Sequence, residues 1–375
     1  MELEASLDWL SLSLTPGLGS RLTGKLLRQF GSPHDVFRAS LTELEACQLP
    51  AAPARAIQTK HAHKEAEAEL ARVRKTGCRL LNWDEPEYPQ RLLEIYDPPP
   101  LLYVRGDAGA LNRHSISMVG TRRPTPYGNQ VAERLGHDLA ERGLTIVSGM
   151  ARGIDSSAHQ GACRAARGGT VGVLGTGIDV IYPKENKKMF VEVEKRGALI
   201  SEFPLGTHPA PENFPVRNRV VAGMALGVIV VQGAQYSGSL ITARLGMEFG
   251  REVYGVPGNV TVDVSFAPNQ MIKQGAKLVT SWEDVVEELP TEIRAQLFPV
   301  EATTAAERAS LFEGTLSPGQ KMIFSLLGTD ETIHVDELVE KSELNSSEVL
   351  AALCEMEMKG VVRQLPGKQF VKILL

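Results

Sequence analysis

The sequence predicts a three-part protein whose central domain is an α/β fold with a doubly wound, mostly parallel sheet. Between residues 116 and 280, seven short apolar runs alternate with amphipathic segments of helical length, and parallel strands need crossovers of this kind. Before these runs, apolar residues recur at helical spacing. After them, three amphipathic segments precede a short hairpin pattern.

The first part, residues 1–75, is predicted to be a small helical domain. Leu22, Leu26 and Phe30 recur at helical spacing, and the pattern stops at Gly31. The PGLG turn before them is compatible with two structures. It could belong to a helix-hairpin-helix, whose glycines let backbone amides approach a DNA phosphate. The alternative is a tight turn in a helical bundle of the sterile-alpha-motif kind.

The second part, residues 76–290, is predicted to hold the sheet. It opens with a Pro-rich, extended leader from Cys78 to Gly106, whose triple proline cannot lie inside a helix. We expect this leader to dock on the central domain. The apolar runs that follow are ISMVG, LTIVSG, TVGVLG, ALISE, LGVIVVQ, EVYGVP and KLVT. Each is predicted to be a strand, and most of the segments between them are predicted to be helices.

The last part is predicted to be a linker, residues 291–316, and a winged-helix domain, residues 317–375. Three helical patterns and a two-stranded hairpin that turns at Pro-Gly are typical of that fold. The expected recognition helix carries Glu348, Glu355 and Glu357, where a groove-reading helix needs Lys, Arg or Asn. We therefore expect this domain to contact a protein or another copy of itself.

Composition excludes several classes of protein. The 375 residues are 43% hydrophobic, and no uncharged apolar run approaches the ~18 residues of a membrane span. The acidic start, MELEASLDWL, is unlike a secretory or transit peptide. The four cysteines are isolated, which argues against a zinc site or a disulfide framework. We expect a cytoplasmic protein without a membrane partner. Because the net charge is −5, a polyanion could bind only at a local cluster of cations.

The first candidate binding motif is the turn VGTRRPTPYG, directly after the first run of the sheet. A strand that enters a Gly-led turn and then a helix can bind an anion. Gly120 and Thr121 stand in that turn, and Arg122 supplies a cation that can form a bidentate contact with a phosphate. The alternative is that Arg122 and Arg123 are surface residues at a strand end.

The second motif, SGMARGID, follows the next strand. Dinucleotide-binding folds usually have Asp or Glu at this strand end to hold the ribose, and the Ser-Gly pair found here argues against NAD. Gly149 and Gly153 can let a ligand come close, and Arg152 is a further candidate. Asp155 is expected to be a helix N-cap, and His159 is expected to serve helix packing rather than catalysis.

Two more motifs complete the candidate site. Lys184 follows a Pro-containing turn in GTGIDVIYPKEN, where it either contacts a phosphate or lies in solvent. In NFPVRNRVVAGM, Phe214 either stacks on a base or belongs to the core. Arg217 and Arg219 lie two residues apart, so at most one of them is expected to face a ligand. A Ser-Gly-Ser turn then opens a helix with free backbone N–H groups. These features predict a site that holds phosphates rather than one that breaks bonds.

In this order the motifs resemble the DNA-processing protein A (DprA/Smf) family. The matching text is MVGTRRPTPYG, SGMARGIDSSAHQGA, VLGTGIDVIYPKEN, ISEFPLG, FPVRNRVVAGM and SGSLITARLGMEFGREVYGVPG, within about residues 80–290. The three-part layout is also similar to that of many members. The resemblance implies an extended Rossmann-like domain that binds single-stranded DNA and forms a homodimer. It also implies that the protein protects incoming DNA during natural transformation and helps to load the RecA recombinase.

The resemblance implies roles for individual residues. Arg122 and Lys184 would grip phosphates, and Phe214 would stack beside a base, with no catalytic residue, metal or cofactor. Several relatives have a lysine three residues before the phenylalanine, whereas this chain has Pro211, which would weaken DNA binding unless another cation substitutes. The usual Gly-rich element after VPG is also altered. The candidate DNA-binding residues are Gly120, Thr121, Arg122, Gly149, Arg152, Gly153, Lys184, Phe214, Arg217, Asn218, Arg219, Ser237, Gly238 and Ser239.

Two enzyme classes are the alternatives. Nucleotide phosphoribohydrolases of the lysine-decarboxylase-like group carry PGGxGTxxE with a catalytic glutamate, but the matching turn here, SGSLITAR, holds no acid. An NAD-dependent dehydrogenase would need the glycine fingerprint and the ribose carboxylate, and this chain has neither.

Overall fold

The computed structural model describes residues 3–298, 316–328, 332–342, 344–358 and 361–372. The chain divides into two compact units after Phe298, and each unit has its own hydrophobic core. None of the described helices is both long enough and apolar enough to cross a membrane.

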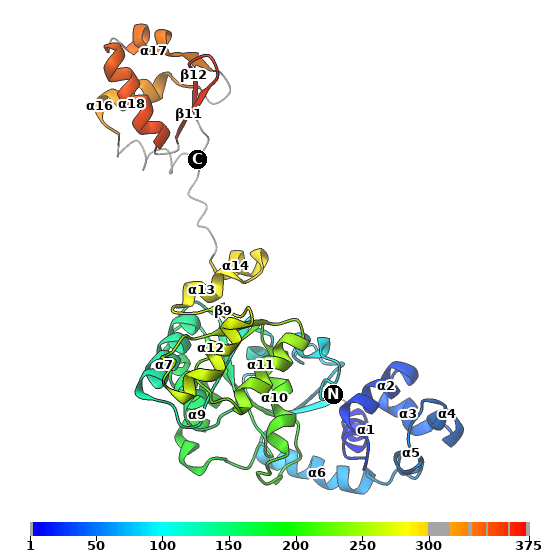
Figure 1. Ribbon diagram of the computed structural model, residues 1–375. Helices are drawn as coiled ribbons and strands as arrows, with labels where there is room; N and C mark the ends of the chain where they lie inside the picture. The colour runs from blue at the N-terminus through cyan, green and yellow to red at the C-terminus, as the bar shows by residue number, and fades with distance from the viewer. Residues whose placement is uncertain (1–2, 299–315, 329–331, 343, 359–360, 373–375) are drawn as a thin grey trace. The chain divides into compact units, whose positions relative to one another are not determined.

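A nine-stranded sheet forms the centre of the first unit (Figure 1). Its strands are β1 (Arg79–Asn82), β2 (Leu101–Gly106), β3 (Ser115–Val119), β4 (Thr145–Ser148), β5 (Gly169–Val173), β6 (Ala198–Ser201), β7 (Gly227–Val230), β8 (Glu252–Gly255) and β9 (Lys277–Leu278). The order is β1-β2-β6-β5-β4-β3-β7-β8-β9. All pairs from β6 to β9 are parallel. The predicted doubly wound, mostly parallel sheet is therefore confirmed, and each of the seven apolar runs overlaps one strand.

The Pro-rich leader contributes more than a docking segment. It forms β1 and β2, which pair antiparallel with each other and extend the sheet antiparallel from β6. A short 3-10 helix, η1 (Gln90–Glu94), lies between them.

Helices cover both faces of the sheet because successive residues of a strand point to opposite sides. Ile116 and Met118 of β3 belong to one core, and Val228 and Val230 of β7 belong to the other. Helices α7 (Pro126–Glu141) and α8 (Ile154–Arg164) contribute to the first core, and α10 (Asn213–Met224), α11 (Gly238–Glu248) and α12 (Phe266–Lys273) contribute to the second. Helix α9 (Lys187–Arg196) packs on β5 and β6.

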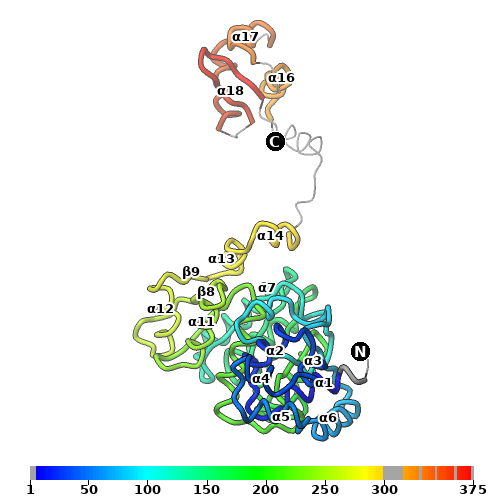
Figure 2. The backbone as a smooth tube through the Cα atoms, turned by 90° about the vertical axis from the view of Figure 1, so that its right-hand side faces the viewer, coloured from blue at the N-terminus to red at the C-terminus, as the bar shows by residue number. Residues whose placement is uncertain are grey.

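Helical structure continues past the last strand into the segment predicted to be a linker. Helices α13 (Trp282–Glu287) and α14 (Thr291–Leu297) follow β9 (Figure 2). Ile293 and Leu297 of α14 are buried in the core that α7 and α8 share. Helix α14 thus occupies the start of the predicted linker 291–316, and residues 299–315 lie outside the described residues.

Six helices form the helical region that precedes the sheet: α1 (Leu3–Ser13), α2 (Ser20–Phe30), α3 (Pro33–Arg38), α4 (Leu41–Ala46), α5 (Ala51–Gln58) and α6 (His63–Thr76). The PGLG turn joins α1 to α2. Buried side chains such as Leu10, Leu26 and Ile57 share a core with Leu101 and Tyr103 of β2. Helix α6 runs from the other five helices toward the sheet (Figure 1), so this region packs directly on the sheet domain, residues 79–298.

The second unit contains α16 (Pro318–Leu326), β10 (Ile333–His334), α17 (Val335–Ser342), α18 (Ser346–Met358), β11 (Val362–Leu365) and β12 (Gln369–Lys372). Its three strands pair antiparallel in the order β10-β12-β11. Phe324, Leu338, Leu353 and Met356 are buried in its core. The predicted winged-helix arrangement is confirmed, and the short strand β10 is an addition to the predicted two-stranded hairpin.

Candidate nucleic-acid interface

A cavity of about 740 Å³ opens at the carboxyl edge of the parallel strands. The segments that follow β3, β4, β5, β6 and β7 all contribute to it, as expected of a ligand site in an open α/β sheet. Its lining consists of Val119, Gly120, Thr121, Arg122, Arg123, Gly149, Ala151, Asp155, Tyr182, Pro209, Pro211, Phe214, Pro215, Arg217, Asn218, Val221, Ser237, Gly238, Ser239, Ile241 and Thr242.

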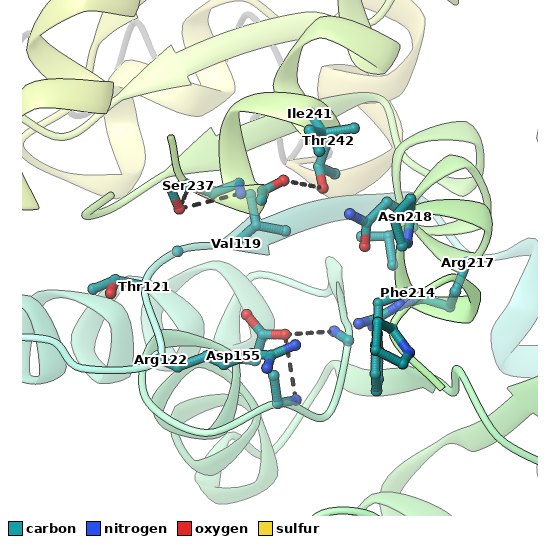
Figure 3. A pocket seen from close by; sticks show the side chains of 18 of the residues that line it. Val119, Thr121, Arg122, Asp155, Phe214, Arg217, Asn218, Ser237, Ile241 and Thr242 are labelled. Carbon is teal, nitrogen blue, oxygen red and sulfur yellow. Dashed lines mark hydrogen bonds between the residues drawn. The ribbon is translucent and has the colours of Figure 1, made fainter. Parts of the chain in front are cut away.

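A cation and an aromatic ring meet at the cavity. Phe214, in the first turn of α10, is half-buried, and the guanidinium carbon of exposed Arg122 lies 5.2 Å from the centroid of its ring. The Tyr182 ring centroid lies 5.7 Å from that of Phe214. Gly175 makes room for the phenyl group, because a Cβ there would lie 2.9 Å from a ring carbon. Figure 3 shows Arg122 and Phe214 on facing sides of the cavity. This pair offers a phosphate contact next to a stacking surface.

The guanidinium of Arg217 is buried beneath this pair. The residue is 5% exposed, and its Nη1 donates a hydrogen bond to the Val173 carbonyl at 3.0 Å. Its Nε has no hydrogen-bond partner in the described part of the chain. Burial lowers the pKa of Arg217 to about 10, with nearby Asp155 opposing the shift and Arg122 adding to it. Arg217 therefore keeps its charge at neutral pH and supplies a buried cation to the cavity.

Asp155 balances this cation. Its carboxylate accepts the N–H of Gly149 at 3.1 Å and that of Ala151 at 3.4 Å. Burial raises the pKa of Asp155, while Arg217 acts in the opposite direction. The N-cap of α8 is Gly153 rather than Asp155, so the predicted capping role is wrong: this carboxylate holds the loop that precedes the helix.

His159 lies behind the charged pair, inside the fold. It is fully buried, and its Nδ1 lies 2.7 Å from the hydroxyl of Thr170. Burial and, to a lesser extent, Arg217 lower the pKa of His159 to about 3. The expectation that this histidine serves helix packing rather than catalysis agrees with that environment.

The amino terminus of α11 forms the wall of the cavity that faces Arg122 and Asp155 (Figure 3). Ser237 is the N-cap, and its hydroxyl accepts the N–H of Ser239 at 3.3 Å. The two hydroxyl oxygens lie 2.8 Å apart. The first turn of α11 carries no acidic side chain. A helix start of this kind favours an anionic ligand through the helix dipole.

Arg219 does not belong to the cavity. Its Nε lies 3.3 Å from a carboxylate oxygen of Asp97, and its Nη2 bonds to Glu202 and to the Ser20 hydroxyl. Its side chain is 8% exposed. The structure therefore places Arg219 outside the cavity lining, because residues two apart on a helix point to different sides, and its DNA contact stays a prediction. Arg217 and Asn218 face the cavity instead.

Three other predicted residues also lie outside the cavity lining. Lys184 begins a short 3-10 turn and is exposed to solvent. Arg152 forms an ion pair with Glu185 and lines a small neighbouring pocket, which Phe214 also lines. At Gly153, with φ +75°, a Cβ would lie 2.4 Å from the Thr121 carbonyl oxygen, so close packing of two loops requires this glycine.

Several lining residues were missed by the sequence analysis. Tyr182 stands in the GTGIDVIYP motif, and an aromatic residue soon after a strand end was the signal that could have found it. The prolines at positions 209 and 215 and the α11 residues Ile241 and Thr242 carry no such signal. Among the described residues, no group of three or more His, Cys, Asp or Glu side chains is placed to hold a metal ion.

Comparison with known proteins identifies the family. A family model described as DNA recombination-mediator protein A matches residues 79–290, and one described as DprA winged helix domain matches residues 302–368. This chain belongs to the DprA family. Its curated relatives include DNA processing protein DprA of Bacillus subtilis, 44% identical over 59% of this chain and 74% of that protein. Another is protein Smf of Escherichia coli, 37% identical over 81% of this chain and 80% of that protein.

Solved DprA structures match the fold. DprA of Streptococcus pneumoniae superposes with a TM-score of 0.68 and 32% identity, over 77% of this chain and 99% of that chain. DNA processing protein A of Helicobacter pylori, whose structure concerns its mode of binding single-stranded DNA, gives a TM-score of 0.51 and 29% identity. That match covers 56% of this chain and 94% of the other. The resemblance to the DprA/Smf family is confirmed.

Proposed function

We propose that this protein binds single-stranded DNA in the cavity and acts as a recombination mediator rather than as an enzyme. The observation that carries the proposal is the Arg122 guanidinium over the Phe214 ring at 5.2 Å, inside a cavity that the start of α11 also lines. Phosphate neutralisation and base stacking are the two interactions by which proteins bind single strands without regard to sequence.

The environment of Asp155 supports a non-enzymatic role. Asp155 is the one carboxylate among the described residues that line the cavity. It accepts two backbone N–H groups, and Arg217 is the nearby charge that most opposes its raised pKa. These hydrogen bonds and the nearby guanidinium favour the charged form of Asp155, which suits a carboxylate that holds a loop better than one that gives up a proton.

Membership of the family supports a wider role. We propose that the protein forms a homodimer through its sheet domain, acts in the cytoplasm, and helps to load the RecA recombinase on incoming single strands during natural transformation. The expected weakening of DNA binding by Pro211 stays a prediction.

The test is a titration of a labelled poly-dT oligonucleotide and of the same sequence as a duplex, each at two salt concentrations. We expect tight binding to the single strand alone and an affinity that falls with salt. Absence of single-strand binding at low salt would overturn the proposal. Hydrolysis of nucleotide monophosphates at enzyme-like rates would instead favour the phosphoribohydrolase alternative. Loading is tested by RecA ATPase activity on DNA coated with a single-strand-binding protein.

A further inference from the structure

A buried carboxylate of the helical region reaches a loop of the cavity. Glu69, on α6, is 4% exposed. Its Oε1 accepts the backbone N–H of Leu205 at 2.7 Å and the hydroxyl of Tyr103 at 3.0 Å. Its Oε2 accepts Nη1 of Arg72 at 3.0 Å. Each carboxylate oxygen therefore has at least one donor, and one of these donors belongs to the segment that follows β6.

A second contact joins the same helix to the same segment. Nη2 of Arg72 lies 3.8 Å from Oδ2 of Asp179, in the loop after β5. Oδ1 of Asp179 accepts the N–H of Gly206 at 2.7 Å, and the N–H of Gly177 bonds to the Thr207 carbonyl at 3.0 Å. The loops after β5 and β6 are thus connected to each other and to α6.

Both loops supply walls of the cavity. The loop after β5 carries Tyr182, and the loop after β6 carries Pro209 and Pro211 before it enters α10 at Asn213. Phe214 and Arg217 come from the first turns of that helix. The Leu205 N–H held by Glu69 lies at the start of the loop, and the stacking ring lies just past its end.

A buried carboxylate is a costly way to hold two regions together. Burial penalises the charged form unless hydrogen bonds compensate, and apolar residues of similar volume often pack at least as stably. A carboxylate also orients its partner, because its hydrogen bond fixes the direction of the backbone N–H group that donates to it. The geometry of Glu69 suits orientation of the loop better than simple attachment of α6.

We propose that Glu69 is a positioning residue for DNA binding: through Leu205 it sets the course of the loop that places Pro209, Pro211 and Phe214 around the cavity. The proposal rests on the proposed function. The helical region then contributes to the affinity of the sheet domain without touching the DNA.

The test compares Glu69→Leu with Glu69→Gln in the full chain, with the poly-dT titration as the readout. Leucine removes both acceptors, and we expect about a tenfold loss of affinity, the size expected from the loss of one or two buried hydrogen bonds. Glutamine keeps an amide oxygen for the Leu205 N–H and the Tyr103 hydroxyl, so it should restore affinity to within about threefold of the unmodified protein. If Glu69 served stability alone, Glu69→Leu and Glu69→Gln would bind poly-dT equally well when their affinities are compared at the same folded fraction.

A double-mutant cycle with Phe214→Ala separates positioning from a general effect. If Glu69 acts through the loop, Glu69→Leu should cost clearly less affinity when the phenyl ring is already absent. Additive losses would contradict the proposal. So would normal DNA binding by a folded Glu69→Leu protein, whereas failure of the unmodified protein to bind would contradict the proposed function instead.

A second variant keeps the test decisive if Glu69→Leu does not fold. Asp179 is more exposed than Glu69, so Asp179→Ala removes the Gly206 contact at a smaller risk to the fold. We expect a loss of about fivefold in poly-dT affinity, the size expected from the loss of one hydrogen bond. Unchanged affinity of this variant would overturn the proposal.

Discussion

The guanidinium of Arg217 fills the space that a side chain at Gly149 would need. A Cβ built on Gly149 would lie 1.7 Å from Nη1 of Arg217 and 2.4 Å from its Cζ. Glycine at the end of β4 is therefore what permits a buried cation in the cavity.

Gly149→Ala should displace Arg217 and weaken binding of poly-dT at least tenfold. Overpacking of this kind costs about 1–3 kcal/mol of stability, which urea unfolding will measure. Gly319→Ala is the matched control, because Gly319 lies outside the cavity lining and the nearest atom to a Cβ there is Cδ1 of Leu344, at 3.6 Å. Equal effects of the two alanines would mean that Arg217 has no role in the cavity.

Arg122→Ala should reduce the affinity for single strands and also its dependence on salt. Each neutralised phosphate contributes about 0.7 to the slope of log K against log salt, so we expect the slope to fall by about that amount. Arg113→Ala is the control, since Arg113 is also exposed and precedes β3 at the other edge of the sheet. An unchanged slope for Arg122→Ala would remove Arg122 from the phosphate contacts.

Phe214→Ala should weaken binding by about 1–3 kcal/mol, the usual contribution of a stacked base, with little change of the salt slope. Phe214→Tyr keeps the ring and should bind nearly as well as the unmodified protein. Tyr96→Ala removes an exposed aromatic ring outside the cavity lining and should have no effect. A loss of affinity in all three variants would indicate a general disturbance.

Most of the fold and part of the site could be predicted from the sequence. Strands such as β3 and β7 are short apolar runs bounded by glycine, and a parallel sheet then brings their following turns to one edge. The contrast between Arg217 and Arg219 could be predicted only as an alternative, because which of two arginines faces a cavity depends on how α10 packs. Glu69 could not be found at all, since its partner Leu205 lies far away in sequence and offers a backbone group.

Arg219→Ala should act on stability. Its guanidinium lies between Asp97 and Glu202, and burial already raises the pKa of the Glu202 carboxyl, with Arg219 opposing that shift. Breaking a buried ion pair leaves an uncompensated charge and costs about 3–5 kcal/mol. Urea unfolding should show this loss, and Arg219→Lys should recover part of it. Poly-dT affinity of the folded fraction should stay within about threefold, because only a large residual loss would place Arg219 at the DNA.

His159 should make the protein less stable in mild acid. Its folded pKa is about 3, below the ordinary value near 6.5. As pH falls through 6.5 the unfolded chain takes up a proton and the folded chain does not. The free energy of unfolding should therefore fall by about 1.4 kcal/mol between pH 7.5 and 5.5. His159→Gln should not show this loss of unfolding free energy. Urea unfolding of the unmodified protein and of the variant, each at pH 7.5 and pH 5.5, measures the difference. Identical pH dependence would contradict a neutral buried imidazole.

The loop that carries Pro209 and Pro211 has consequences for the thermodynamics of binding. Proline fixes φ, and the carboxylates of Glu69 and Asp179 hold the N–H groups at the start of this loop. Such a wall is preorganised: it has few conformations left to lose when a strand enters, so the entropic penalty of association is reduced. The rigidity of this loop thereby contributes to affinity. The contribution of a flexible cationic side chain depends on electrostatic attraction and falls with salt, whereas the contribution of the rigid loop to the binding free energy should persist at high ionic strength.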